Sequence, residues 1–105
     1  MESFEYVRRV LEAYRTTPGT CGAIRKPDRA FALQLFDRGV ALAVVENALV
    51  LACARRLARP ADAPPLGVIR SLAYFSPVID EVLELRISDA YFQYLRFHLS
   101  RTARP

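Results

Sequence analysis

Metal-binding and catalytic side chains are scarce in this sequence. It has one histidine, His98, and two cysteines, Cys21 and Cys53, which do not form a CxxC pair. A zinc site requires several such ligands at close spacing, so we predict neither a metal site nor a bound cofactor. The four glycines do not form the glycine-rich loop with a following lysine that holds phosphates in nucleotide-binding enzymes. We therefore predict that the protein is not an enzyme and has no catalytic residues.

The sequence also lacks a long apolar segment. Its longest apolar stretch covers 15 residues, 40–54, and contains Glu46 and Asn47, whereas a membrane span needs about 20 apolar residues. The first ten residues, MESFEYVRRV, contain acids and arginines where the apolar part of a signal peptide would lie. We expect a cytoplasmic protein that has no membrane partner.

The apolar residues that are present follow helical spacing. Near the N-terminus they recur at steps of three or four and form one face: Phe4, Val7, Leu11 and Tyr14. Residues 40–54 are apolar on almost every side, which is typical of a helix that is buried on almost every side. We predict the all-α class, with residues 1–105 as a single domain. This domain is a compact bundle of about five helices around a central apolar helix at about 42–58.

Capping residues indicate where the first helices begin and end. Ser3 is the predicted N-cap of a helix that runs to about residue 15. Asp28 is the predicted N-cap of a second helix over 29–38, and Gly39 occupies the C′ position after it. Gly39 then opens a tight corner into the central helix.

The second half of the chain contains weaker boundary signals. Leu66 begins the pattern LGVIRSLAYF, which suggests a fourth helix. Ser76 and Pro77 either start a new helix or kink a longer one. Ser88 is the predicted N-cap of the last helix.

Positive charge is concentrated in the first part of the chain. Residues 1–61 contain ten basic and six acidic residues, and residues 62–105 contain five of each, so the net charge of +4 belongs to the first part. Two groups of basic residues flank the predicted helix pair: Arg25, Lys26 and Arg29, then Arg55, Arg56 and Arg59. If these groups lie close in space, they predict a surface for the DNA or RNA backbone. The alternative is that the second group complements the dipole at a helix end.

A helix-turn-helix that reads base sequence is a poorer interpretation of the same region. Its second helix would have to present polar or basic side chains to base edges. The central helix offers Ala43, Glu46, Asn47 and Val50 instead. The sequence therefore favours contact with nucleic acid that is not sequence-specific.

The last helix is rich in aromatic residues, within the segment YFQYLRFHL. Such a stripe belongs either to the core or to a helix-packing interface. A chain of this length cannot bury every ring, so Tyr91, Tyr94 and Phe97 are candidates for a surface that binds a protein partner or a second copy of the chain. This gives an alternative function, that of a protein-interaction or assembly module.

The helix order from Tyr14 to Val82 resembles the DnaD-like domains of bacterial replication initiation and of phage or plasmid replication proteins. The matching residues are mostly helix-packing positions: Gly39, Val40, Val45, Ala48, Ala52, Ile69, Leu72, Tyr74 and Phe75. The chain has no tryptophan, the residue that commonly closes the family's second motif. The resemblance implies a helical accessory of a replication or mobile-element machine, with DNA as partner. The chain is equally similar to small bacterial helical proteins, a resemblance that implies no function.

Overall fold

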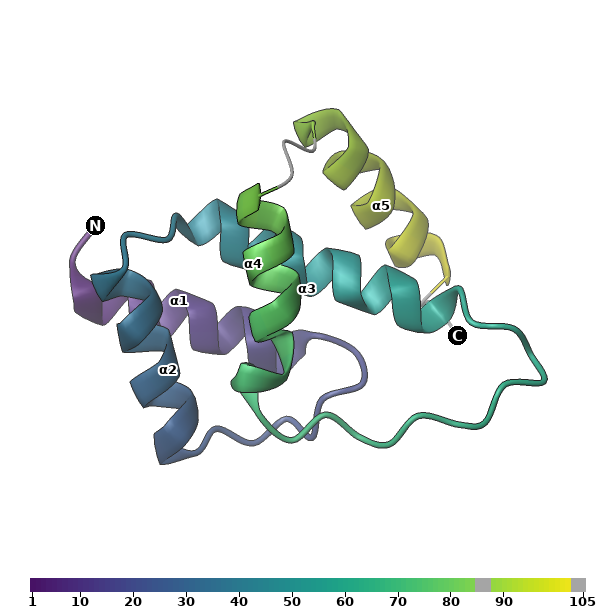
Figure 1. The fold of residues 1–105 in the computed structure, drawn as a ribbon, viewed down its shortest axis with the longest axis horizontal. Helices are drawn as coiled ribbons and strands as arrows, with labels where there is room; N and C mark the ends of the chain where they lie inside the picture. Colours follow the sequence, from purple (N-terminus) through teal and green to yellow (C-terminus); the bar gives the residue numbers. More distant parts are fainter. Residues whose placement is uncertain (85–87, 103–105) are drawn as a thin grey trace.

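The computed structural model describes residues 1–84 and 88–102, and this part of the chain is all-helical. It contains five α-helices and one 3₁₀ helix (Figure 1), in the order α1 (Ser3–Thr16), α2 (Lys26–Asp37), α3 (Leu42–Leu57), η1 (Leu72–Phe75), α4 (Ser76–Glu84) and α5 (Asp89–Thr102). The predicted all-α bundle of about five helices is confirmed. The Cα radius of gyration of 13.7 Å is close to the value of about 13 Å for a compact domain of roughly 100 residues. Across the described ranges, no helix has both the length and the apolar content needed to cross a membrane.

Helix α3 is the centre of the bundle, as its all-round apolar sequence predicts. Helices α1, α4 and α5 and the short η1 all pack against it. Its buried residues lie on several sides of the helix: Val45, Ala48, Leu49, Leu51, Ala52 and Cys53. Its observed end at Leu57 is one residue from the predicted end. Any exposed functional surface must therefore lie at the ends of α3 or on the helices around it.

The corner between α2 and α3 is closed by Gly39, as predicted. Gly39 has a φ of +74°, a conformation in the left-handed region that favours glycine. Its N–H donates to the Phe36 carbonyl at 2.9 Å and the N–H of Val40 donates to the Leu35 carbonyl at 3.0 Å, the pair of bonds that defines a Schellman motif. The Tyr6 hydroxyl on α1 donates to the Val40 carbonyl at 2.8 Å. These bonds fix the direction in which α3 leaves the corner.

Two predicted helix starts are wrong. Helix α2 begins at Lys26, and Asp28 is its third residue, where the carboxylate reaches back to accept a hydrogen bond from the N–H of Arg25. Helix α1 includes Ser3 as its first residue, and Glu2 occupies the N-cap position. In both cases the helix begins at or before the polar residue that is predicted to cap it, and the extended backbone of an N-cap belongs to Glu2 and Arg25 instead.

The predicted helix from Leu66 is also wrong. Residues 66–71 are non-helical, and an isolated parallel bridge joins Thr20 to Ile69. The N–H of Ile69 donates to the Gly19 carbonyl and the N–H of Cys21 donates to the Ile69 carbonyl, both at 2.8 Å. This pairing with the loop after α1 satisfies backbone groups that a helix would have paired internally. A new helix starts at Ser76, which is one of the two predicted alternatives.

Helix α5 packs on α3 through one side. Phe92 and Leu95 are buried, and they lie three residues apart on the same face of the helix. The Ser88 hydroxyl accepts a hydrogen bond from the N–H of Tyr91 at 3.3 Å, so the predicted cap of this helix is confirmed.

Candidate functional sites

The structure separates the two predicted basic groups. The first group lies at the start of α2 and the second around the end of α3: Arg25, Lys26 and Arg29, then Arg55, Arg56 and Arg59. Helix α2 packs on α1 and η1, and Figure 1 shows the start of α2 and the end of α3 at different ends of the molecule. The two groups therefore do not form one continuous basic face.

Arg55 is engaged by an acidic side chain of α4. Its guanidinium donates two hydrogen bonds to the Glu81 carboxylate, at 2.5 and 2.7 Å, in the bidentate geometry that suits this pair. The hydrogen bonds from Arg55 lower the pKa of Glu81, and those to Glu81 raise the pKa of Arg55. This ion pair joins α3 to α4, and it neutralises one charge of the predicted basic group.

Arg56 and Arg59 are held by neutral oxygens. Arg56 donates to the Gly67 carbonyl at 2.9 Å and to the Tyr74 hydroxyl at 3.3 Å. Arg59 donates to the Pro64 carbonyl at 3.0 Å. These bonds hold the proline-rich segment after α3 in place, and the acceptors do not cancel the charge of either guanidinium.

The basic group at the start of α2 lies beside an apolar groove. Arg25, Lys26 and Arg29 are all exposed. Arg29 borders a groove of about 550 Å³ between α1 and α2, which also contains the exposed side chains of Phe4 and Leu33. This surface combines positive charge with apolar area.

The three aromatic candidates of α5 lie on the surface. Tyr91, Tyr94 and Phe97 are 45%, 60% and 63% exposed. They follow one another at steps of three residues, so their side chains are neighbours along the helix. The ring of Tyr94 stacks on His98 with a centroid distance of 6.0 Å. Tyr91, Tyr94 and Phe97 define the aromatic face of α5. Tyr91 lies at the border between this face and the side that packs on α3, because it is four residues before the buried Leu95.

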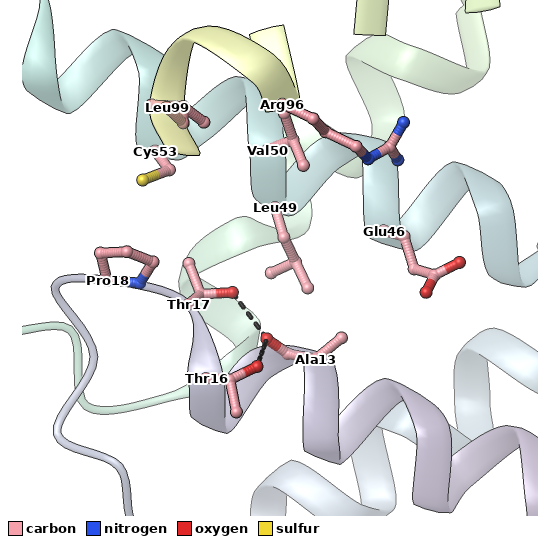
Figure 2. A pocket seen from close by; sticks show the side chains of 10 residues that line it. All are labelled: Ala13, Thr16, Thr17, Pro18, Glu46, Leu49, Val50, Cys53, Arg96 and Leu99. Atoms are coloured by element: carbon pink, nitrogen blue, oxygen red, sulfur yellow. Dashed lines mark hydrogen bonds between the residues drawn. The ribbon is translucent and has the colours of Figure 1, made fainter. Parts of the chain in front are cut away.

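A cavity of about 440 Å³ lies between α1, α3 and α5. Figure 2 shows Glu46 and Cys53 of α3 at opposite ends of it, with Leu49 between them. Both threonines at its lower edge, Thr16 and Thr17, donate to the Ala13 carbonyl. Burial raises the pKa of the Cys53 thiol, which keeps it protonated and therefore a weak nucleophile at neutral pH. The cavity thus offers an apolar floor and no activated group at Cys53.

A buried polar cluster was missed by the sequence analysis. Asp28 is 1% exposed, and its carboxylate accepts hydrogen bonds from the backbone N–H groups of Arg25 and Leu72, both at 2.9 Å. Tyr14 is fully buried beside it. Burial, and then the charge of Asp28 and the Cys21 thiol, raises the pKa of Tyr14 to about 12. The cluster joins α2 to η1. The sequence around Asp28 does not predict this role, because aspartate at a helix start is interpreted as an ordinary N-cap.

The chain matches no protein-family model, and comparison with curated proteins and with solved structures gives no match either. The resemblance to DnaD-like domains therefore stays a prediction. Among the described residues, no group of three or more histidine, cysteine, aspartate or glutamate side chains is arranged to hold a metal ion.

Proposed function

We propose that the protein is an assembly module that pairs with a second copy of itself through the aromatic face of α5. The observation that carries this proposal is the exposure of Tyr94, at 60%, between two further exposed rings. Large aromatic side chains provide much of the binding energy at protein interfaces when a partner covers them. Exposed rings that are neighbours on one helix face are typical of such contacts.

The composition of the face favours a second copy as the partner. Its members are aromatic and uncharged, and a twofold contact places the same surface on both sides. The nearby guanidinium of Arg96 donates to the Asn47 side chain on α3, so this charge is directed to the neighbouring helix. Two such faces can therefore meet without opposing like charges at Tyr94.

The oligomeric state tests this proposal. We expect the wild-type chain to be a dimer at micromolar concentration in light scattering, and Tyr94→Glu to weaken the dimer by at least about tenfold, because a buried unpaired carboxylate is costly. Gln34→Glu adds the same charge at an exposed position on α2, away from the aromatic face, and we expect it to remain a dimer. A wild-type monomer, or equal behaviour of the two variants, would rule out this role for Tyr94.

A second candidate function is contact with the nucleic-acid backbone through the basic group at the start of α2. The exposure of Arg25, Lys26 and Arg29 on adjacent turns supports it. We expect weak binding to duplex DNA at low salt that declines as salt is raised. A Lys26→Gln, Arg29→Gln double variant should reduce this binding. The control is Arg9→Gln, Arg38→Gln, which removes the same charge at exposed positions away from the start of α2 and should leave binding nearly unchanged. Failure of the wild type to bind DNA at low salt would exclude the candidate.

A further inference from the structure

A second, smaller cavity lies where α3 ends. Its volume is about 310 Å³, and its lining comes from α3, α4, η1 and the segment after α3. Ala52 and Val78 contribute apolar surface. The remaining walls include four side chains that carry N–H or aromatic groups: Arg55, Arg56, Arg59 and Tyr74. We call this space the arginine cavity.

The charge of the arginine cavity is positive. Arg55 is paired with Glu81, but Arg56 and Arg59 donate to neutral oxygens and keep their charges. No carboxylate belongs to the described lining of the cavity. A guanidinium has more N–H donors than these bonds use, so both side chains retain donors for a ligand. Arg56 is in the last turn of α3 and Arg59 is two residues beyond its end, and two positive charges are complementary to a dianion.

An aromatic surface lies next to this charge. The Arg56 guanidinium is 6.0 Å from the centroid of the Tyr74 ring, and Tyr74 is half-exposed. The buried Phe75 packs edge-on against Tyr74 with a centroid distance of 5.2 Å, which holds the ring in place. A flat apolar group can therefore contact the Tyr74 ring while an anionic group attached to it reaches the arginines.

We propose that the arginine cavity binds a phosphomonoester that carries a small aromatic group. A phosphomonoester has a charge of about −1.5 to −2 at neutral pH, which matches Arg56 and Arg59 better than a single carboxylate does. The volume accommodates a ligand at the small end of the usual range. The site is independent of the proposed assembly function, because α5 contributes no residue to the lining that the structure describes.

Titration calorimetry with phenyl phosphate on the full chain tests the proposal. We expect saturable one-to-one binding, at least about tenfold tighter than that of inorganic phosphate, and no detectable binding of phenol. Arg59→Gln should weaken binding of phenyl phosphate by about tenfold, since it removes one of two charges. Arg70→Gln removes the same charge at an exposed position outside the cavity and should leave binding unchanged.

A second variant separates the aromatic contact from the charge. Tyr74→Leu keeps apolar volume but removes the ring, and we expect it to abolish the preference for phenyl phosphate over inorganic phosphate. Circular dichroism of each variant establishes that it folds. Arg59 is preferred over Arg56 for substitution because Arg59 donates one hydrogen bond, to Pro64, whereas Arg56 donates to both Gly67 and Tyr74. Absence of phenyl phosphate binding by the wild type, or equal weakening by Arg59→Gln and Arg70→Gln, would overturn the proposal.

Discussion

Replacing the buried phenylalanine of η1, Phe75→Ala, should lower the free energy of unfolding by about 4 kcal/mol. The Phe75 side chain is fully buried, and its ring meets that of Tyr14 edge-on at a centroid distance of 6.1 Å. Truncation removes this contact and leaves a space that rigid neighbours fill only in part. Against a total stability of roughly 5–15 kcal/mol, this loss is large enough to unfold a substantial fraction of the chain on mild heating.

Urea unfolding followed by circular dichroism measures this loss. Phe4→Ala is the matched control, because the same truncation takes place at a ring that is 78% exposed. We expect the control to change the free energy of unfolding by at most about 0.5 kcal/mol. Similar unfolding midpoints for the two variants would show that η1 is not part of the core.

Removing the buried carboxylate, Asp28→Ala, should cost about 3 kcal/mol. The two backbone N–H groups that it accepts from, those of Arg25 and Leu72, would lose a charged acceptor within the protein. Because Leu72 lies 44 residues from Asp28 in the sequence, the substitution also loosens the contact between α2 and η1. Asp28→Asn keeps one acceptor oxygen and should give a smaller loss.

Asp37→Ala provides the comparison for this second prediction. Asp37 is at the other end of α2 and is exposed, so its removal should change stability by no more than about 0.5 kcal/mol. Urea unfolding of Asp28→Ala, Asp28→Asn and Asp37→Ala measures how much each substitution lowers the free energy of unfolding. If Asp28→Ala unfolds at the same midpoint as Asp37→Ala, the carboxylate does not join the two elements in solution.

Local sequence patterns were sufficient for much of the fold. Residues 40–54 predict a buried central helix because apolar side chains cover its whole circumference. Gly39 predicts a corner because few other residues adopt a positive φ. Ser88 predicts the start of α5 because its hydroxyl accepts from an N–H only three residues away. Each of these features depends on interactions between residues that are close in the sequence.

The same local patterns failed where a distant segment competes. LGVIRSLAYF has helical spacing, but Ile69 instead pairs its backbone with Gly19 and Cys21, and these residues are too far away in the sequence to affect a local pattern around Ile69. Aspartate is a common N-cap, but the Asp28 carboxylate also accepts a hydrogen bond from the N–H of Leu72, a residue that is distant in the sequence. The helix propensity of a short segment is small compared with the free energy of such tertiary hydrogen bonds and packing.

The candidate sites also depend partly on local sequence and partly on tertiary contacts. Composition and spacing by themselves identified the arginines after residue 54 and the aromatic residues of the last helix, because both depend only on residue type and position along a helix. Only the tertiary structure decided that Glu81 neutralises Arg55 while Arg56 and Arg59 keep their charges beside Tyr74. The partners of Arg55 and Arg56 come from α4, η1 and the segment between α3 and η1. The charge left at each guanidinium is therefore a property of how the helices pack.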